Sequence, residues 1–217
     1  MGIISRFPAG ATKPYIEEIY NSDGQLISAN MYGYDAIRDN AFYDCTNLAL
    51  ISLPNGITSI GSSAFENCSS LALTSLPSGI TSLGSYAFRH CSSLALTSLP
   101  SGITDIDAST FSDCSSLALT TLPNGITSIG SNAFSNCQNL ALTSLPSGIT
   151  NIGSYAFESC LSLVSLTFEG TPESIHNSAF FRCNNLTTIN VPWAEGAVVN
   201  APWGATNATI HYNYRGA

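Results

Sequence analysis

The sequence predicts a repeat solenoid built from coils of 23 residues. Two observations predict it. A leucine three residues after each cysteine and a phenylalanine three residues before it keep one phase along the chain. The cysteines themselves follow one another every 23 residues without insertion or deletion, as Cys45, Cys68, Cys91, Cys114, Cys137, Cys160 and Cys183. A fixed period of this length indicates coils that bury their apolar side chains only by stacking on one another.

Each coil divides into short segments with recognisable boundaries. In the coil that ends at Cys91, Leu76-Pro77-Ser78-Gly79 has the residues of a type I turn at the end of a first strand. Ile80-Thr81-Ser82-Leu83 has the composition of a second, short extended segment. A serine before Ala87-Phe88 can cap one helical turn that closes at the cysteine. We therefore expect an α/β repeat with single helical turns.

The chain divides into three predicted parts. Residues 1–24 form an N-terminal segment and hairpin cap, residues 25–190 the solenoid, and residues 191–217 a C-terminal capping coil. Tyr15–Tyr20 and Gln25–Ser28 flank Asn21-Ser22-Asp23-Gly24, which is the order strand, turn, strand. The last part carries flat side chains that can cover the open end of a stacked core, namely Trp193, Trp203, Tyr212 and Tyr214.

The cysteines are compatible with disulfides or with buried thiols. Their number is odd, and equivalent positions in stacked coils lie about 4.8 Å apart, whereas the Cβ atoms of a disulfide lie about 3.8 Å apart. We therefore expect reduced, buried thiols. Zinc is not expected, because the chain has no CxxC pair and no cysteine–histidine cluster.

One corner of the predicted solenoid concentrates carboxylates, with Asp105, Asp107 and Asp113 in the same coil. A weak calcium site is one interpretation and a solvated acidic corner the other. We favour the solvated corner, because no loop here supplies the six oxygen ligands that calcium takes. The sequence thus predicts no metal and no cofactor.

Composition excludes several classes of function. Only 9% of the residues are charged and the net charge is -8, so the six Lys and Arg residues cannot form the basic patch that a nucleic acid requires. No apolar run approaches the about 18 residues of a membrane span. The chain has no G-x-S-x-G or H-E-x-x-H motif, and His90, His176 and His211 lie in different coils. We expect no catalytic residues and no enzyme.

The repeat LPxGITSIGxxAFxxCxxL resembles the BspA-like (Treponema pallidum-type) leucine-rich repeat over about Gln25 to Thr209. The resemblance implies a right-handed leucine-rich-repeat solenoid with parallel strands on a concave face and short strands on the convex face. It also implies a cell-surface or extracellular location and a role in adhesion or protein binding. Residues 1–10 lack the charged start and long apolar centre of a secretory signal.

Two functions from different classes follow. The first is a non-enzymatic protein-binding or adhesion module whose partner is a host or bacterial surface protein, with self-association as a further option. The alternative is a structural or receptor-binding component of a phage particle or other assembly, located in the virion, to which the leaderless start and the separate N-terminal segment point. A water-ordering surface is disfavoured, because the chain lacks the Thr-x-Thr spacing that such a surface needs.

The register of the first strand decides what the concave face presents. The family has an apolar residue three positions after the first leucine, as Leu166 follows Leu163, but four coils read Leu-Ala-Leu-Thr. If the threonines kept that inward position, each buried hydroxyl without a partner would cost about 1 to 3 kcal/mol. We therefore favour inward Leu73, Leu96, Leu119 and Leu142. The candidate concave surface is then Ser52, Ser75, Ser98, Thr121, Ser144, Thr167 and Asn190 beside Thr74, Thr97, Thr120 and Thr143.

Overall fold

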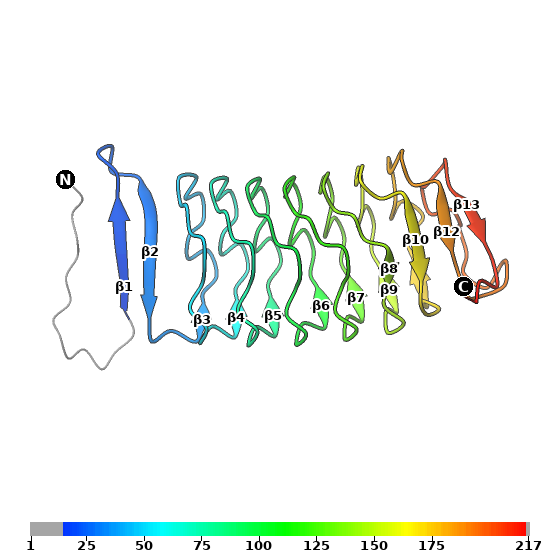
Figure 1. The fold of residues 1–217 in the computed structure, drawn as a ribbon, viewed down its shortest axis with the longest axis horizontal. Coiled ribbons are helices and arrows are strands. Elements are labelled where there is room, and N and C mark those ends of the chain that lie inside the picture. Colours follow the sequence, from blue (N-terminus) through cyan, green and yellow to red (C-terminus); the bar gives the residue numbers. More distant parts are fainter. Residues whose placement is uncertain (1–14, 216–217) are drawn as a thin grey trace.

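The computed structural model describes residues 15–215, so the expectation about residues 1–10 lies outside the described residues. The chain forms a parallel β-solenoid of about eight turns, which Figure 1 shows side by side along the long axis. We define coil 1 as the turn that ends at Cys45, and each later coil ends 23 residues further on, at Cys68 for coil 2 and at Cys183 for coil 7.

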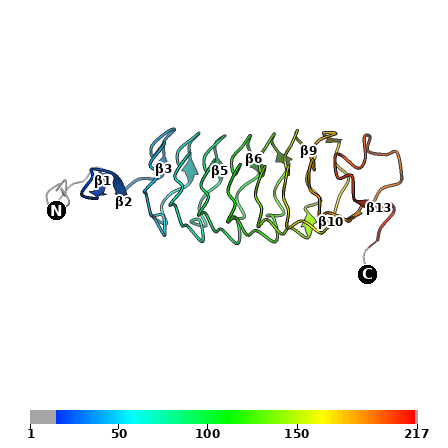
Figure 2. The ribbon, with the colours of Figure 1, turned by 90° about the horizontal axis from the view of Figure 1, so that it is seen from above.

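An antiparallel hairpin lies at the N-terminal end of the stack (Figure 2). It consists of β1 (Tyr15–Tyr20) and β2 (Leu26–Tyr32). Asn21 closes the turn, since its side-chain oxygen accepts hydrogen bonds from the backbone N–H groups of Asp23 and Gln25. The β2 strand buries Ala29 and Met31 in the core. The hairpin predicted between residues 15 and 28 therefore forms, and its second strand extends to Tyr32.

The isoleucine side of each coil carries the short strands predicted for the convex face. Each strand has two residues, of which the second is buried, and neighbouring strands pair in parallel and in register, as Ile60 does with Leu83. The ladder is interrupted between β5 and β6. The strands are β3 (Ala36–Ile37), β4 (Ser59–Ile60), β5 (Ser82–Leu83), β6 (Asp105–Ile106), β7 (Ser128–Ile129), β9 (Asn151–Ile152) and β11 (Ser174–Ile175).

Apart from β2 of the hairpin, the leucine side of residues 15–215 carries strands only from coil 6 onward, namely β8 (Ser144–Leu145), β10 (Ser165–Phe168), β12 (Thr188–Asn190) and β13 (Thr209–His211), all parallel. The expectation of concave strands in every coil is therefore correct only for this part. In coil 3, Leu73 and Leu76 are both buried while Thr74 and Ser75 between them are exposed. Two consecutive outward residues break the alternation of a strand, so no ladder forms there.

The phenylalanine side holds the segment for which a helical turn was expected, but no helix forms anywhere in residues 15–215. In coil 2 the backbone makes successive turns, each closed by a hydrogen bond from an N–H group to the carbonyl three residues earlier. Two residues in this segment are left-handed, Ser63 at φ 51° and Asn67 at φ 65°. A left-handed residue cannot continue a right-handed helix. The N–H groups of Ser63 and Asn67 instead donate to the carbonyls of Ser85 and Arg89 in coil 3, at 2.9 and 2.8 Å.

The core is a set of ladders closed by aromatic rings at its C-terminal end. The buried phenylalanines from Phe42 to Phe180 stack through the coils, with ring centroids 5.1 to 5.6 Å apart. Trp203 is fully buried and its indole N–H donates to the carbonyl of Val199 at 2.7 Å. Trp193 is also buried, whereas Tyr214 is exposed, so the two tryptophans provide most of the predicted aromatic cover.

Candidate binding surface

The threonine row on the leucine side faces solvent. Thr74, Thr97, Thr120 and Thr143 are exposed. The leucines that precede them, Leu73, Leu96, Leu119 and Leu142, are at most 2% exposed. The inward register of the leucines is confirmed, and an exposed leucine stripe is excluded. The surface is therefore polar.

The second predicted row changes character along the stack. Ser52, Ser75, Ser98 and Thr121 are exposed, whereas Ser144, Thr167 and Asn190 are half-buried. From coil 6 onward the strands pair and the side chains bond to one another, as when Ser144 donates to Glu169 at 2.7 Å and Asn190 to Thr167 at 3.2 Å. The exposed part, which we call the Thr/Ser face, comprises Ser52, Thr74, Ser75, Thr97, Ser98, Thr120, Thr121 and Thr143.

The Thr/Ser face presents hydrogen-bonding groups without partners. Within residues 15–215, none of its eight hydroxyl groups bonds to another part of the chain. The main-chain N–H and C=O groups of Thr74, Ser75, Thr97 and Ser98 also make no hydrogen bond to the described chain. One bond per coil, such as Ala95 N–H to Leu73 C=O at 3.0 Å, holds the coils together beside them. Water or a ligand must satisfy the remaining groups.

The threonines on the isoleucine side behave differently. Thr58, Thr127 and Thr150 donate their hydroxyl protons to carbonyls of the preceding coil, at 2.9, 3.3 and 3.1 Å. Thr104 is the exception, because its hydroxyl donates to Asp105 at 2.7 Å beside the interrupted ladder between β5 and β6. This row therefore serves mainly to join coils.

The acidic corner of coil 4 is not a cluster of three carboxylates. Hydrogen bonds from Ser128 and Thr104 hold the pKa of Asp105 below its usual value. Asp113 instead contacts His90 at 3.5 Å and accepts from Asn136 at 2.9 Å. Across residues 15–215 no group of three His, Cys, Asp or Glu side chains is arranged to hold a metal ion.

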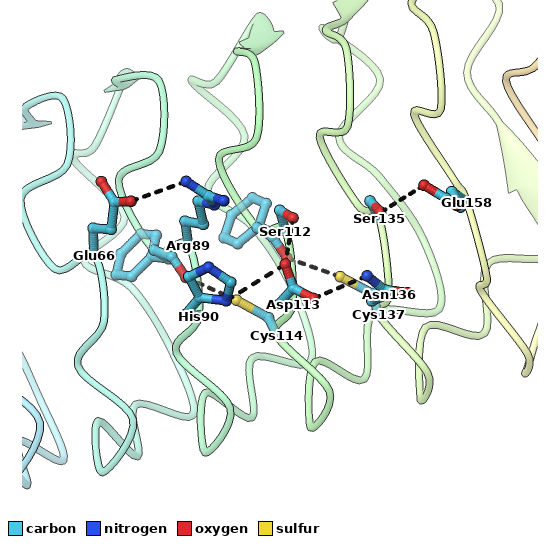
Figure 3. A network of polar contacts seen from close by, with 12 residues as sticks. Glu66, Arg89, His90, Ser112, Asp113, Cys114, Ser135, Asn136, Cys137 and Glu158 are labelled. Atoms are coloured by element: carbon cyan, nitrogen blue, oxygen red, sulfur yellow. Dashed lines mark hydrogen bonds and ion pairs between the residues drawn. The ribbon is translucent and has the colours of Figure 1, made fainter.

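Polar groups on the phenylalanine side are also paired between coils (Figure 3). Arg89 and Glu66 form an ion pair at 3.2 Å, and Ser135 donates to Glu158 at 3.3 Å. Several polar groups on the isoleucine and phenylalanine sides are thus engaged in bonds between coils, whereas none of the eight hydroxyl groups of the Thr/Ser face bonds to another part of residues 15–215.

The histidines of residues 15–215 lie in different coils. His176 contacts the hydroxyl of Ser178 at 2.8 Å, but the backbone N–H of Ser178 approaches the same ring nitrogen at 3.3 Å. This local pattern closes a turn on the surface. His90 lies beside Asp113, and His211 is in β13 at the C-terminal end of the stack.

All seven cysteines are free and six are buried. Each buried thiol donates to the carbonyl of a phenylalanine in the preceding coil, as Cys91 does to Phe65 at 3.0 Å. Burial raises the pKa of the Cys68 and Cys183 thiols to about 12. Cys45 in coil 1 is partly exposed and lacks such a partner; its sulfur lies 3.8 Å from the carbonyl of Tyr43.

A family model describes the same repeat. The model of the BspA type leucine rich repeat region matches residues 35–138 and 104–195, with six copies. The chain belongs to the BspA-type leucine-rich-repeat family. Proteins of this repeat family are generally protein-binding or surface proteins and typically not enzymes.

Two solved bacterial structures resemble this BspA-type chain. The leucine-rich repeat protein of T. pallidum is 27% identical with a TM-score of 0.55, and the match covers 86% of this chain and 85% of that one. A leucine-rich repeat protein from Bacteroides ovatus is 23% identical with a TM-score of 0.54, and the match covers 87% of this chain and 45% of that one. This chain thus spans less than half of the B. ovatus protein. No curated protein matches it, and none of its described residues form a helix able to cross a membrane.

The thiol ladder of this BspA-type solenoid predicts a pH dependence. The unfolded chain ionises its thiols from near their ordinary pKa of 9.0, whereas the folded chain keeps Cys68 protonated until about pH 12. The stabilisation is therefore complete below pH 9.0 and is lost as the pH rises toward 12. We expect the free energy of unfolding, measured with denaturant, to fall between about pH 9 and about pH 12.

A double substitution provides the control for tyrosine ionisation. Cys91→Ala with Cys114→Ala removes two of the six buried thiols and leaves every tyrosine in place. Its stability should decline less steeply over the same pH range. Parallel curves for the two proteins would contradict the assignment to the thiols.

Proposed function

We propose that this chain is a non-enzymatic protein-binding or adhesion module of the cell surface and that the Thr/Ser face contacts the partner. The observation that carries the proposal is the contrast between the sides. On the isoleucine and phenylalanine sides several polar side chains bond between coils. On the Thr/Ser face the eight hydroxyl groups, and the main-chain groups of Thr74, Ser75, Thr97 and Ser98, have no partner among residues 15–215. Family membership supports protein binding in general.

The chemistry of the face determines the kind of recognition. The eight side chains of the Thr/Ser face are uncharged, although the chain carries a net charge of -8. Small hydroxyl side chains give adaptable hydrogen bonding, and the buried leucines behind them hold the face rigid. We therefore expect binding through hydrogen bonds with little dependence on salt, because screening weakens only interactions between charges.

Cell adhesion provides the test. Beads coated with the protein are applied to cultured epithelial cells and to bacterial cells, each with and without protease treatment of the cell surface. We expect adhesion to one cell type, its loss after protease treatment and its persistence at high salt. Ser98→Arg with Thr120→Arg should abolish it by placing two large cations on the face.

The matched control is Ser82→Arg with Asn151→Arg, which adds the same charge at exposed positions of the isoleucine side. This variant should adhere like the original protein. Adhesion that survives protease treatment would exclude a protein partner. Equal loss in both double variants would show that charge, and not the Thr/Ser face, determines binding.

A further inference from the structure

Large apolar side chains gather on the phenylalanine side where coils 6 and 7 meet. Tyr155, Leu161 and Phe181 are 40%, 38% and 39% exposed. The rings of Tyr155 and Phe181 meet edge to face at 5.9 Å, and the Arg182 guanidinium lies over the Phe181 ring at 5.1 Å. Leu161 lies two residues after Ser159, whose backbone N–H donates to the carbonyl of Phe181 at 3.0 Å. We call Tyr155, Leu161, Phe181 and Arg182 the aromatic patch.

Coils 4 and 5 provide an internal comparison, because they place polar residues at the same repeat positions. One and two coils before Leu161 stand Gln138 and Ser115, and two coils before Phe181 stands Ser135. Polar residues therefore satisfy the fold at these positions. The apolar side chains of the aromatic patch are not needed for packing of the coil, and exposed apolar clusters of this kind mark interaction sites.

The backbone adds an independent observation. Arg182 has φ 60° and Tyr155 has φ 54°, in the left-handed region that asparagine adopts more readily than larger side chains. The equivalent positions hold Asn136 at φ 60° and Asn132 at φ 56°. The chain thus retains bulky residues at two positions of the patch where they are conformationally unfavourable. Coil 3 also has bulky residues there, Tyr86 and His90, but the patch differs in Phe181, whose ring both Tyr155 and Arg182 contact.

Charge indicates what the patch binds. Arg182 forms no ion pair with any carboxylate in residues 15–215, since the two ion pairs found there involve Arg89 and His90. Arg89 also lies over an aromatic ring, Tyr86, at 5.7 Å, but Glu66 already pairs with it. The aromatic patch therefore combines apolar surface with the guanidinium of Arg182, which can form an ion pair with a carboxylate of another molecule.

We propose that the aromatic patch docks a segment of a partner protein that carries an apolar side chain next to a carboxylate. The apolar side chain packs on Phe181, Tyr155 and Leu161, and the carboxylate pairs with Arg182. Aromatic and arginine side chains dominate the energetics of protein interfaces, and carboxylates form the strongest hydrogen bonds with guanidinium groups. This surface lies on a different side of the coil from the Thr/Ser face, so the two proposals stand separately.

Peptide binding tests the docking. The probe is a short fluorescein-labelled peptide in which leucine and glutamate alternate, followed by fluorescence anisotropy. Matched peptides replace every glutamate by lysine or every leucine by serine. We expect the leucine–glutamate peptide to bind at least about tenfold more tightly than either matched peptide, because it alone supplies both groups.

Two double variants locate the binding. Phe181→Ser with Arg182→Asn introduces the residues that coil 5 has at Ser135 and Asn136, so the fold should persist and thermal stability should stay equal or rise. This variant should bind the leucine–glutamate peptide about tenfold more weakly. Tyr86→Ser with His90→Asn also removes one exposed aromatic side chain, at the repeat position of Tyr155, and the residue at the position of Arg182, but in coil 3; it should leave binding unchanged.

Several results would overturn the docking proposal. Absence of binding by the leucine–glutamate peptide, or equal binding of the lysine peptide, would remove the assigned partner chemistry. Unchanged binding after Phe181→Ser with Arg182→Asn would place the peptide elsewhere. If the original protein is a dimer that dissociates on this double substitution, the patch is an interface between copies of the chain.

Discussion

Removal of residues 200–217 should make the protein aggregate, whereas deletion of one whole coil, residues 92–114, should leave it soluble and folded. The truncation removes Trp203, which is fully buried and whose carbonyl accepts the Phe180 N–H at 2.9 Å. The core end at Phe168 and Phe180 would then face solvent. The coil deletion joins Cys91 to Ser115, which restores the repeat because Ser115 and Ser92 are equivalent. Each coil contacts only its neighbours, so coil 3 can stack on coil 5.

Size-exclusion chromatography with light scattering and circular dichroism distinguishes the two outcomes. The coil deletion should give a monodisperse species with the β-sheet signal of the original protein. The truncated chain should elute as large aggregates. A soluble truncation together with an aggregated coil deletion would contradict the role assigned to the C-terminal coil.

The second large effect on stability is expected at the buried leucines that lie behind the Thr/Ser face. Leu96→Ser with Leu119→Ser removes two side chains that are 0% exposed and places hydroxyl groups in an apolar ladder. Removal of a buried leucine side chain typically costs about 2 to 5 kcal/mol, and each buried hydroxyl without a partner adds about 1 to 3 kcal/mol. The double variant should therefore be largely unfolded, because whole domains are stable by only about 5 to 15 kcal/mol.

The control changes the neighbouring outward residues. Thr97→Ser with Thr120→Ser alters the same two coils at exposed positions and should change the free energy of unfolding by less than about 0.5 kcal/mol per site. Urea denaturation followed by circular dichroism measures both variants. A leucine variant as stable as the threonine variant would show that the leucine row does not hold the core.

The sequence predicts the ladders well, because an exact repeat forces equivalent residues into equivalent environments. The buried leucines, the phenylalanine stack and the free thiols follow from the 23-residue phase alone. The inward register could also be predicted, since buried hydroxyls are costly. The cost of buried hydroxyls does not predict the loss of the strand at Thr74 and Ser75. The strand is lost because Leu73 and Leu76 both point inward, which leaves two consecutive residues between them pointing outward.

The sequence also contains a signal against a helical turn on the phenylalanine side. The residues five positions and one position before the cysteine adopt the left-handed conformation in most coils, and they include Asn40, Asn67, Asn132 and Asn136. Repeated asparagine at fixed positions is typical of left-handed backbone. The serine that follows glycine is equally typical of a helix cap. The sequence therefore contains one signal for a helical turn, this serine, and one against it, the repeated asparagines. The repeat does not predict the aromatic patch, because Leu161 and Phe181 depart from the polar residues that coils 4 and 5 have at their positions.

The direction of the hydrogen bonds between coils has an electrostatic consequence. Between coils 4 and 5, Ser109, Phe111 and Asp113 on the phenylalanine side donate their N–H groups forward. Ala118, Thr127 and Gly130 on the other two sides donate backward. The peptide dipoles on the phenylalanine side thus oppose those on the other two sides and partly cancel them, whereas in an α-helix all of them add. The stack therefore gains less dipole moment with each added coil than it would gain if every N–H group between coils pointed in one direction.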